Sequence, residues 1–325
     1  MSCLVTIIIP VFNRAHMIGT AIASLQAQSY THWECVVVDD GSSDGTVKVL
    51  ADYVAEDARI RYYTRERLPK GAPTCRNIGL QHAKGNYVIY LDSDDYLLPF
   101  CLEQRVAAFK KNPTAHFLVF PMGVQKEDVV VKQEIPEHTD YLIRFLSADL
   151  PWQTMCPIWD RNFLKALNGF AEGYPRFNDP ELMIRALLQD HLDYKVFADY
   201  DYDSVFIPSV KAQAVFTTKV YKSLQLFVPD IAKLLDVKEK THLKPYLLLY
   251  LHLWFKYFYV PLAKRGLKPS MRLLQLYRQH DILGFKQYMS LLARLLVYAV
   301  SVKVLPKAID KLTEQRLYRP NDKDL

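Results

Sequence analysis

Three carboxylates crowd four positions of the chain, Asp92-Ser93-Asp94-Asp95, directly after the apolar run 87–91. An ionised carboxylate is costly to bury without a partner, so three of them in one place need either a cation or water. The residue types therefore predict a bound metal or a solvated turn. Asp95 alone has another ordinary role, as the cap of a helical segment that starts near Pro99. The choice depends on which other side chains the fold brings to the same place.

Two further polar clusters follow apolar runs in the same way. Residues 4–9 (LVTIII) lead into Pro10-Val11-Phe12-Asn13, and residues 33–38 (WECVVV) lead into Asp39-Asp40-Gly41-Ser42. Apolar runs rich in β-branched residues are typical of strands that are buried on both faces. A weaker run of this kind covers 60–64. We therefore expect four strands, the fourth being the run before the acidic cluster.

The stretches between these strands have helical patterns. Residues 17–28 carry apolar side chains at helical spacing, 46–55 follow a Ser-Ser-Asp-Gly turn, and 74–82 begin after a proline with Thr74 as a candidate cap. Strands that alternate with helices form a parallel, Rossmann-like sheet, in which ligands bind at the carboxyl ends of the strands. The three polar clusters should therefore lie at one edge and form one site.

This set of side chains suits a nucleoside diphosphate. Phe12 offers an aromatic ring, Asp40 can accept a hydrogen bond from a base N–H, and the acidic cluster can hold a metal. The sequence has no GxxxxGK[ST] loop and no GxGxxG after the first strand, so a cation must carry the phosphate charge. Each feature also has an ordinary alternative. The run 39–42 is a typical Asx turn, and Arg76 alone would be a surface charge on a helix.

Five motifs, in order, resemble glycosyltransferase family 2, whose members have the GT-A fold. They are VTIIIPVFN (5–13), SLxxQSY (24–30), WECVVVDDGSSDGT (33–46), RNxG (76–79) and GNYVIYLDSDD (85–95). The resemblance covers residues 4 to about 215. It implies an α/β fold, with a Rossmann-like mixed, mainly parallel sheet flanked by helices and a helical C-terminal extension.

The resemblance also implies which residues bind the nucleotide sugar. Pro10 and Val11 would offer backbone contacts to the nucleoside, and Phe12 stands where the family usually has a tyrosine near the base. Asp40 matches the residue that accepts from a uracil-type ring N–H. Arg76 matches a basic residue that reaches the base or the diphosphate.

On the phosphate side, Asp92 and Ser93 would lie along the path of the ribose and the phosphates. Asp94 matches the metal-binding aspartate of the family's DxD motif. The cofactor implied is Mg²⁺ or Mn²⁺, hard cations that prefer carboxylate and phosphate oxygens.

The acceptor side is expected further along the chain. Asp179 aligns with the aspartate proposed as catalytic base in inverting members, although the usual Glu-Asp pair is Asn178-Asp179 here. An alternative is that Asp179 is a helix N-cap, because a proline follows it. Glu181 and Trp152 are further acceptor-side candidates. Trp152 and Trp159 would line a sugar-stacking surface, and burial in a core is their ordinary alternative.

The implied function is that of an inverting, metal-dependent glycosyltransferase. It would move a sugar from a nucleoside-diphosphate sugar, with a UDP-sugar favoured, to a hydroxyl of a glycan or lipid-linked glycan acceptor, as in surface polysaccharide synthesis. The alternative is a catalytically degenerate nucleotide-sugar-binding or scaffold protein, which Asn178 supports. A sugar nucleotidyltransferase would need a glycine-rich loop after the first strand, and residues 11–14 contain no glycine.

Charge divides the chain into two parts. Residues 1–218 carry 21 Lys and Arg against 27 Asp and Glu, whereas residues 219–325 carry 20 against 8. We expect a GT-A catalytic domain at 1–218, with a donor half at 1–112 and an acceptor half at 113–218. Residues 219–325 should form a basic, aromatic, mainly helical region.

The apolar parts of this C-terminal region, 247–260 and 291–302, are broken or bracketed by charges, so we expect no membrane crossing. Two interpretations remain: helices packed on the catalytic domain, or amphipathic helices on an anionic membrane. The charge favours the second. The basic residues that would face lipid are Lys264, Arg265, Lys268 and Arg272. An aromatic cluster supports it: Trp254, Tyr257 and Tyr259.

The remaining features concern the compartment and the partners. The 5 cysteines form no CxxC or Cys/His metal spacing, which is typical of reduced thiols. The first residues show neither the basic region nor the cleavage site of a secretory signal. We therefore expect a cytoplasmic protein, peripheral on the cytoplasmic face of the membrane. No nucleic-acid-binding motif accompanies the basic region, so we expect no nucleic acid partner.

Overall fold

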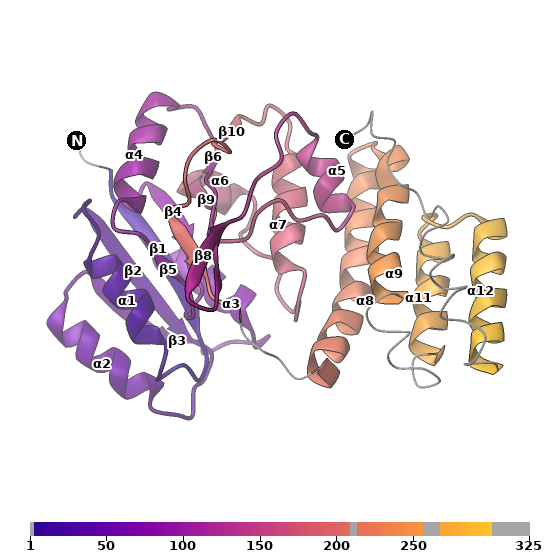
Figure 1. Ribbon diagram of the computed structural model, residues 1–325, viewed down its shortest axis with the longest axis horizontal. Helices are drawn as coiled ribbons and strands as arrows, with labels where there is room; N and C mark the ends of the chain where they lie inside the picture. The colour runs from indigo at the N-terminus through magenta and orange to yellow at the C-terminus, as the bar shows by residue number, and fades with distance from the viewer. Residues whose placement is uncertain (1–2, 209–212, 256–266, 301–325) are drawn as a thin grey trace. The chain divides into compact units, whose positions relative to one another are not determined.

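The computed structural model describes residues 3–208, 213–255 and 267–300 (Figure 1). The chain forms two compact units. The first unit comprises Met1–Glu137, Pro151–Gly173 and Gln189–Val210. The second unit comprises His138–Leu150, Tyr174–Leu188 and Lys211–Leu325. Two internal segments thus group with the C-terminal helices, so the units do not divide at residue 218. The domain boundary there stays a prediction.

A seven-stranded sheet, in the order β10-β6-β9-β4-β1-β2-β3, dominates the described part of the first unit. Four neighbouring strands are parallel: β4 (Tyr87–Tyr90), β1 (Val5–Val11), β2 (Trp33–Asp39) and β3 (Ile60–Thr64). An antiparallel strand joins them to a parallel pair: β9 (Pro157–Asp160), then β6 (Phe117–Val119) and β10 (Tyr194–Val196). The prediction of a mixed, mainly parallel sheet is confirmed, and the four predicted strands are β1 to β4.

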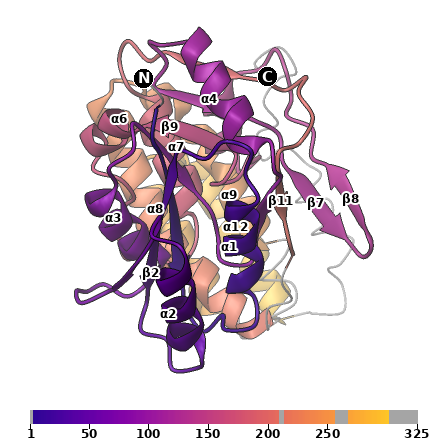
Figure 2. The same ribbon diagram turned by 90° about the vertical axis from the view of Figure 1, so that its left-hand side faces the viewer.

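Helices cover both faces of this sheet. Figure 2 shows α1 (Ile18–Gln26) and α3 (Ala72–His82) on opposite sides of it, and α3 packs on β1 and β2. The strands are mainly apolar because both faces are covered, and every residue of β1 and β2 is buried. The other helices of the first unit are α2 (Thr46–Glu56), α4 (Cys101–Lys111) and α6 (Arg161–Ala166).

The predicted start of α3 at Thr74 is wrong. The helix begins at Ala72, with Gly71 at the N-cap and Pro73 in the first turn, where a proline loses no hydrogen bond. Thr74 is buried inside the helix and does not cap it.

A smaller sheet stands beside the main one, in the order β5-β11-β7-β8. Its strands are β5 (Tyr96–Leu97), β11 (Ser204–Phe206), β7 (Gly123–Lys126) and β8 (Val129–Lys132). A fully buried ion pair links α4 to the residue before β11. Arg105 donates to the Asp203 carboxylate from Nε at 2.8 Å and Nη2 at 2.5 Å, and its Nη1 donates to the Met155 carbonyl at 2.8 Å.

Because this pair is buried, Asp203→Asn should leave an uncompensated guanidinium. We expect the free energy of unfolding to fall by about 3–5 kcal/mol. Thermal melting measures it, with a drop of more than about 6 °C expected. Asp281→Asn is the matched control. Asp281 pairs with Arg278 at 3.3 Å on the solvent-exposed surface, and such pairs contribute about 0–1 kcal/mol to the free energy of unfolding. Equal melting shifts in the two variants would contradict the assignment.

The second unit is helical in its described part, which confirms the predicted helical extension. Its helices are α5 (Tyr141–Leu146), α7 (Asn178–Leu187), α8 (Gln213–Val237), η1 (Thr241–Leu247), α9 (Leu248–Trp254), α11 (Leu267–Gln279) and α12 (Phe285–Val300). Aromatic contacts hold them together: Tyr250 packs on Phe177 and Phe227, and its hydroxyl donates to the Phe145 carbonyl at 2.8 Å. None of the described helices is long and apolar enough to span a membrane.

Candidate functional site

The three polar clusters lie at one edge of the large sheet, as predicted. β1 lies between β2 and β4, all three run parallel, and Val11 is paired with Asp39 at the ends of β1 and β2. Hydrogen bonds tie the first two clusters together. The Asp40 N–H donates to the Val11 carbonyl at 2.8 Å, and the Asn13 N–H donates to Ser42 Oγ at 2.8 Å. The residues after β1 and β2 therefore form one connected rim.

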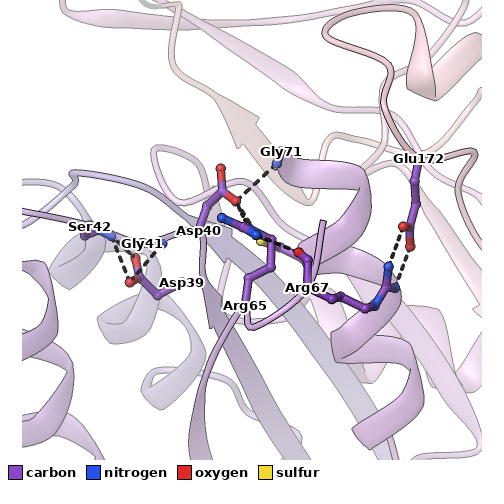
Figure 3. A network of polar contacts seen from close by, with 9 residues as sticks. Asp39, Asp40, Gly41, Ser42, Arg65, Arg67, Gly71 and Glu172 are labelled. Carbon is purple, nitrogen blue, oxygen red and sulfur yellow. Dashed lines mark hydrogen bonds and ion pairs between the residues drawn. The ribbon is translucent and has the colours of Figure 1, made fainter. Parts of the chain in front are cut away.

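The two aspartates at the end of β2, Asp39 and Asp40, have different roles, and Figure 3 shows their carboxylates pointing away from each other. Asp39 builds the turn: it accepts from the Gly41 N–H at 3.2 Å, the Ser42 N–H at 2.9 Å and the Ser42 hydroxyl. The Asx-turn alternative thus describes Asp39. Asp40 takes no part in that turn.

Asp40 is held by one of its two oxygens (Figure 3). Oδ1 accepts from Arg65 Nε at 2.5 Å and from the Gly71 N–H at 3.1 Å, and the Cys75 Sγ lies 3.8 Å away. Burial, and then the Asp40 carboxylate, raise the pKa of the Cys75 thiol to about 12, so it stays neutral. Sequence reasoning missed Arg65, although its place directly after the third strand puts it at the same edge.

Loop 65–71, which joins β3 to α3, also reaches Phe12. Phe12 is 40% exposed, and the Lys70 ammonium lies 3.7 Å from the centroid of its ring, in a cation–π contact. Pro10 and Val11 are buried strand residues, so only their backbone can serve a ligand. The exposed Phe12 ring and the Asp40 carboxylate are thus both contacted by this loop, and sequence reasoning missed Lys70 as well.

The acidic cluster brings together carboxylate oxygens of Asp92, Asp94 and Asp95 within 4.8 Å of one another. Asp95 is buried, and its Oδ1 accepts from the Ile207 N–H at 2.8 Å. The N-cap of α4 is Phe100, so the alternative that Asp95 caps a helix near Pro99 is wrong. Burial, and then the neighbouring Asp92 carboxylate, raise its pKa to about 8. Asp92 and Asp94 are only partly buried, whereas Ser93 is buried between them.

Two arginines balance part of this charge. Arg76 Nη2 donates to Asp92 Oδ1 at 2.6 Å, and its guanidinium carbon lies 4.9 Å from the Phe170 centroid. Arg76 is only 3% exposed, so the alternative of a surface charge is wrong. Arg14 Nη2 lies 3.7 Å from Asp94 Oδ2. Crowded carboxylate oxygens, one of them with a raised pKa, fit the ligand preference of a divalent cation.

The predicted acceptor-side residues Asp179 and Glu181 belong to the second unit, in the first turn of α7. The N-cap of this helix is Phe177, in a left-handed conformation with φ 61°, so the alternative of Asp179 as the N-cap is wrong. Asn178 Nδ2 donates to Asp179 Oδ1 at 2.9 Å. Glu181 is buried and forms a two-bond pair with Arg185, at 2.5 and 2.8 Å.

The two candidate sugar-stacking tryptophans are buried. Trp159 lies in β9 and packs on Phe117 with centroids 4.7 Å apart, so it is a core residue. Trp152 is 2% exposed and offers no open ring face. Both observations fit the alternative of core aromatics, because an indole must keep one face open to stack on a sugar.

Comparison with known proteins gives one family. The family model described as glycosyl transferase family 2 matches residues 6–161. The Escherichia coli UDP-Glc:alpha-D-GlcNAc-diphosphoundecaprenol beta-1,3-glucosyltransferase WfgD is 39% identical over 138 residues, which cover 42% of this chain and 53% of that protein. The Campylobacter jejuni GalNAc(5)-diNAcBac-PP-undecaprenol beta-1,3-glucosyltransferase is 39% identical over 93 residues, 29% of this chain and 30% of that protein. The chain thus spans about half or less of the length of these relatives.

Solved structures share the fold. Staphylococcus aureus TarS 1–349 in complex with UDP-GlcNAc superposes with a TM-score of 0.66 at 20% identity, covering 91% of this chain and 88% of that chain. A mannosyltransferase from Pyrobaculum calidifontis in complex with GDP-Man and Mn²⁺ gives a TM-score of 0.54 at 19% identity, over 95% and 83% of the two chains. The sheet with its flanking helices is therefore the GT-A fold.

Proposed function

Residues 6–161 belong to glycosyltransferase family 2, and from this premise we propose that the protein transfers a sugar from a nucleoside-diphosphate sugar to a hydroxyl group of a glycan or lipid-linked glycan. A UDP-sugar is the favoured donor. The name of WfgD includes UDP-Glc, and the TarS structure holds UDP-GlcNAc; both support this choice. The diphosphoundecaprenol in the name of WfgD supports a lipid-linked acceptor, as in surface polysaccharide synthesis.

One observation carries the proposal: an exposed aromatic ring, a half-engaged carboxylate and a carboxylate cluster share one sheet edge. A nucleoside diphosphate needs these three contacts, for its base, its ring N–H and its phosphate charge. Phe12 would stack on the base and Asp40 would accept the N–H, with Pro10 and Val11 offering backbone contacts. Arg76 would reach the base or the diphosphate.

Asp94, with Asp92 and Ser93 on the phosphate path, would hold a Mg²⁺ or Mn²⁺. When bound, such a cation neutralises charge that grows on the departing nucleoside diphosphate. The side chains present fit it, because the carboxylate oxygens of the acidic cluster lie within 4.8 Å of one another. Arg76 and Arg14 already place positive charge at two of these carboxylates.

Asp179 is the proposed general base. Its carboxylate would take the proton of the acceptor hydroxyl while that oxygen bonds to the anomeric carbon and the bond from this carbon to the diphosphate oxygen breaks. Attack from the face opposite the leaving group inverts the anomeric configuration. The Asn178 amide, which donates to Asp179 Oδ1, would orient the carboxylate. A neutral amide at position 178 thus adds a hydrogen bond where a second carboxylate would repel.

A donor panel tests the proposal. The purified protein is mixed with UDP-, GDP- and other nucleotide sugars, Mn²⁺ and a polyprenyl-diphosphate-linked saccharide, and released nucleoside diphosphate is measured. We expect metal-stimulated release with at least one donor, dependent on the acceptor. Binding of a donor without turnover on any acceptor would instead favour the degenerate, scaffold-like alternative.

The second unit offers a surface for the proposed peripheral attachment to the cytoplasmic face of a membrane. On α12, Phe285, Met289 and Leu296 are exposed at helical spacing, with Lys286 and Arg294 exposed beside them. An apolar stripe flanked by basic residues is typical of a helix that lies on anionic lipid. On α11, two of the predicted lipid-facing residues, Lys268 and Arg272, are exposed.

One part of the membrane prediction is wrong. Trp254 is buried and its Nε1 donates to Ser270 Oγ at 2.9 Å, so its ring does not face lipid. The other residues named for this role lie outside the described residues: Tyr257, Tyr259, Lys264 and Arg265.

Co-sedimentation with vesicles rich in phosphatidylglycerol measures this attachment. We expect Phe285→Ser with Met289→Ser to weaken vesicle binding by at least about 100-fold, because each buried apolar side chain contributes about 1.5–3 kcal/mol and every 1.4 kcal/mol is about tenfold. Val129→Ser with Val131→Ser is the control, since both valines are exposed in the first unit. No binding of the unmodified protein to anionic vesicles at low salt would exclude the membrane role.

A further inference from the structure

We infer that Arg65 determines which nucleobase the donor site accepts. It would do so by occupying one oxygen of Asp40, so that only the other oxygen can read the base. The inference rests on the proposed function, because it concerns the same donor site.

The contacts of Asp40 are one-sided. Arg65 Nε, the Gly71 N–H and the Cys75 thiol all converge on Oδ1 (Figure 3). A carboxylate oxygen has two lone pairs, so this oxygen has no capacity left for a ligand. None of the residues that the structure describes donates to Oδ2. Asp40 is thus a single, charged acceptor.

Arg65 itself is fixed at several points. Besides Asp40, its Nη1 donates to the Arg67 carbonyl at 2.6 Å and its own N–H donates to the Asp39 carbonyl at 2.8 Å. The side chains of Arg65 and Asp40 are only 13% and 10% exposed. A planar guanidinium held in this way loses little further freedom, so the direction of Oδ2 is set before any ligand arrives.

Gly71 supports the same arrangement from the other end of the loop. Its φ of 137° lies in a region that favours glycine, and its N–H reaches Asp40 from there. Lys70, next to it, lies on the Phe12 ring. Loop 65–71 therefore contacts both proposed base-binding side chains. Its first residue, Arg65, is held at Asp40 by their ion pair.

A single negative acceptor discriminates between bases. The ring nitrogens of uracil N3 and guanine N1 carry a hydrogen, whereas cytosine N3 and adenine N1 are acceptors that a carboxylate repels. A site built to accept one N–H can reject an analogue without it by about 10⁴–10⁵. If Arg65 were absent, Asp40 could rotate, and the oriented acceptor would be lost.

The test compares matched nucleotides by calorimetry without added metal: UDP with CDP, and GDP with ADP. Within each pair the phosphates are equal, so the affinity ratio reports the base. We expect the protein to bind UDP more tightly than CDP, or GDP more tightly than ADP. Arg65→Met should weaken binding of the preferred nucleotide by about 10- to 100-fold and change the binding of the other nucleotide of the pair less than about threefold, so that the affinity ratio falls about 10-fold or more.

Arg67→Met is the matched control. Arg67 lies on the same loop and pairs with Glu172 at 2.6 Å, but its side chain does not contact Asp40 (Figure 3). Its variant should keep the ratio. Arg65→Lys keeps the charge but cannot span Asp40 and the Arg67 carbonyl, so the ratio should fall partway. It also decides the matter if Arg65→Met fails to fold.

The outcomes are distinct. An affinity ratio that falls about 10-fold or more in Arg65→Met and stays unchanged in Arg67→Met supports the inference. A protein that discriminates within a pair, and whose Arg65 variants keep the ratio, overturns the inference and leaves the proposed function standing. A protein that binds none of the four nucleotides, with or without Mn²⁺, overturns the proposed function and the inference with it.

Discussion

Asp179→Asn is expected to lower kcat by about 10²–10⁴, the contribution that a positioned general base makes, and to leave the affinity for the donor nucleotide within about twofold. The amide keeps the size of the side chain but cannot take the proton of the acceptor hydroxyl. The two effects separate chemistry from binding, because the proposed donor residues lie in the first unit and Asp179 lies in the second. Steady-state turnover and nucleotide calorimetry on the same preparation measure both.

Asp236→Asn is the control for this variant. It makes the same charge change within the second unit, at a carboxylate that pairs with Lys244 at 2.7 Å, and should leave kcat unchanged. Asn178→Ala should give a smaller loss of kcat than Asp179→Asn, because it removes only the hydrogen bond that orients the carboxylate. Full turnover by purified Asp179→Asn would remove this residue from the mechanism.

The sequence predicted the edge of the sheet well, for a physical reason. A parallel strand covered on both faces must be mainly apolar, so β1, β2 and β4 stand out as runs, and the polar residues at the end of each run mark its carboxyl end. Asp40 and Asp94 could be placed together on this ground alone, since neighbouring parallel strands end at one edge.

The partners of these residues could not be predicted in the same way. Whether Arg65 turns to Asp40, or Arg67 to Glu172, depends on loop geometry and on contacts across 25 and 105 positions of sequence. The buried pair of Arg105 and Asp203 spans 98 positions. No local pattern carries such pairings. The sequence around an arginine looks the same whether its side chain is solvated or buried in a site.

Residue type alone also gave wrong predictions where one type of residue serves two roles. Tryptophan stacks on sugars and also fills cores, and Trp159 proved to lie in the core because its strand, β9, is the antiparallel strand between β4 and β6. The α7 start shows the same limit. Asp179 followed by a proline fits an N-cap, but a left-handed Phe177 begins the helix two residues earlier.

Asp94→Asn is expected to remove metal-stimulated transfer, with a loss of about 10²–10³-fold in kcat/KM, comparable to the removal of a major electrostatic contact to the leaving group. The asparagine keeps the shape of the side chain and removes the charge that a divalent cation needs. Compared with the unmodified protein, the variant should bind UDP more weakly in the presence of Mn²⁺ and equally well in EDTA. That split arises because the proposed base contacts, Phe12 and Asp40, lie on other strand ends than Asp94.

Asp44→Asn is the matched control, since Asp44 is an acidic residue of the same rim whose carboxylate accepts from the Thr46 N–H at 2.9 Å and does not join the acidic cluster. It should keep both the metal stimulation and the Mn²⁺-dependent gain in UDP affinity. If Asp94→Asn lost UDP affinity equally with Mn²⁺ and with EDTA, the carboxylate would act on the nucleotide directly. Asp94 would then be a phosphate-side contact paired with Arg14, and the cation, if one binds, would have to be held by Asp92 and Asp95.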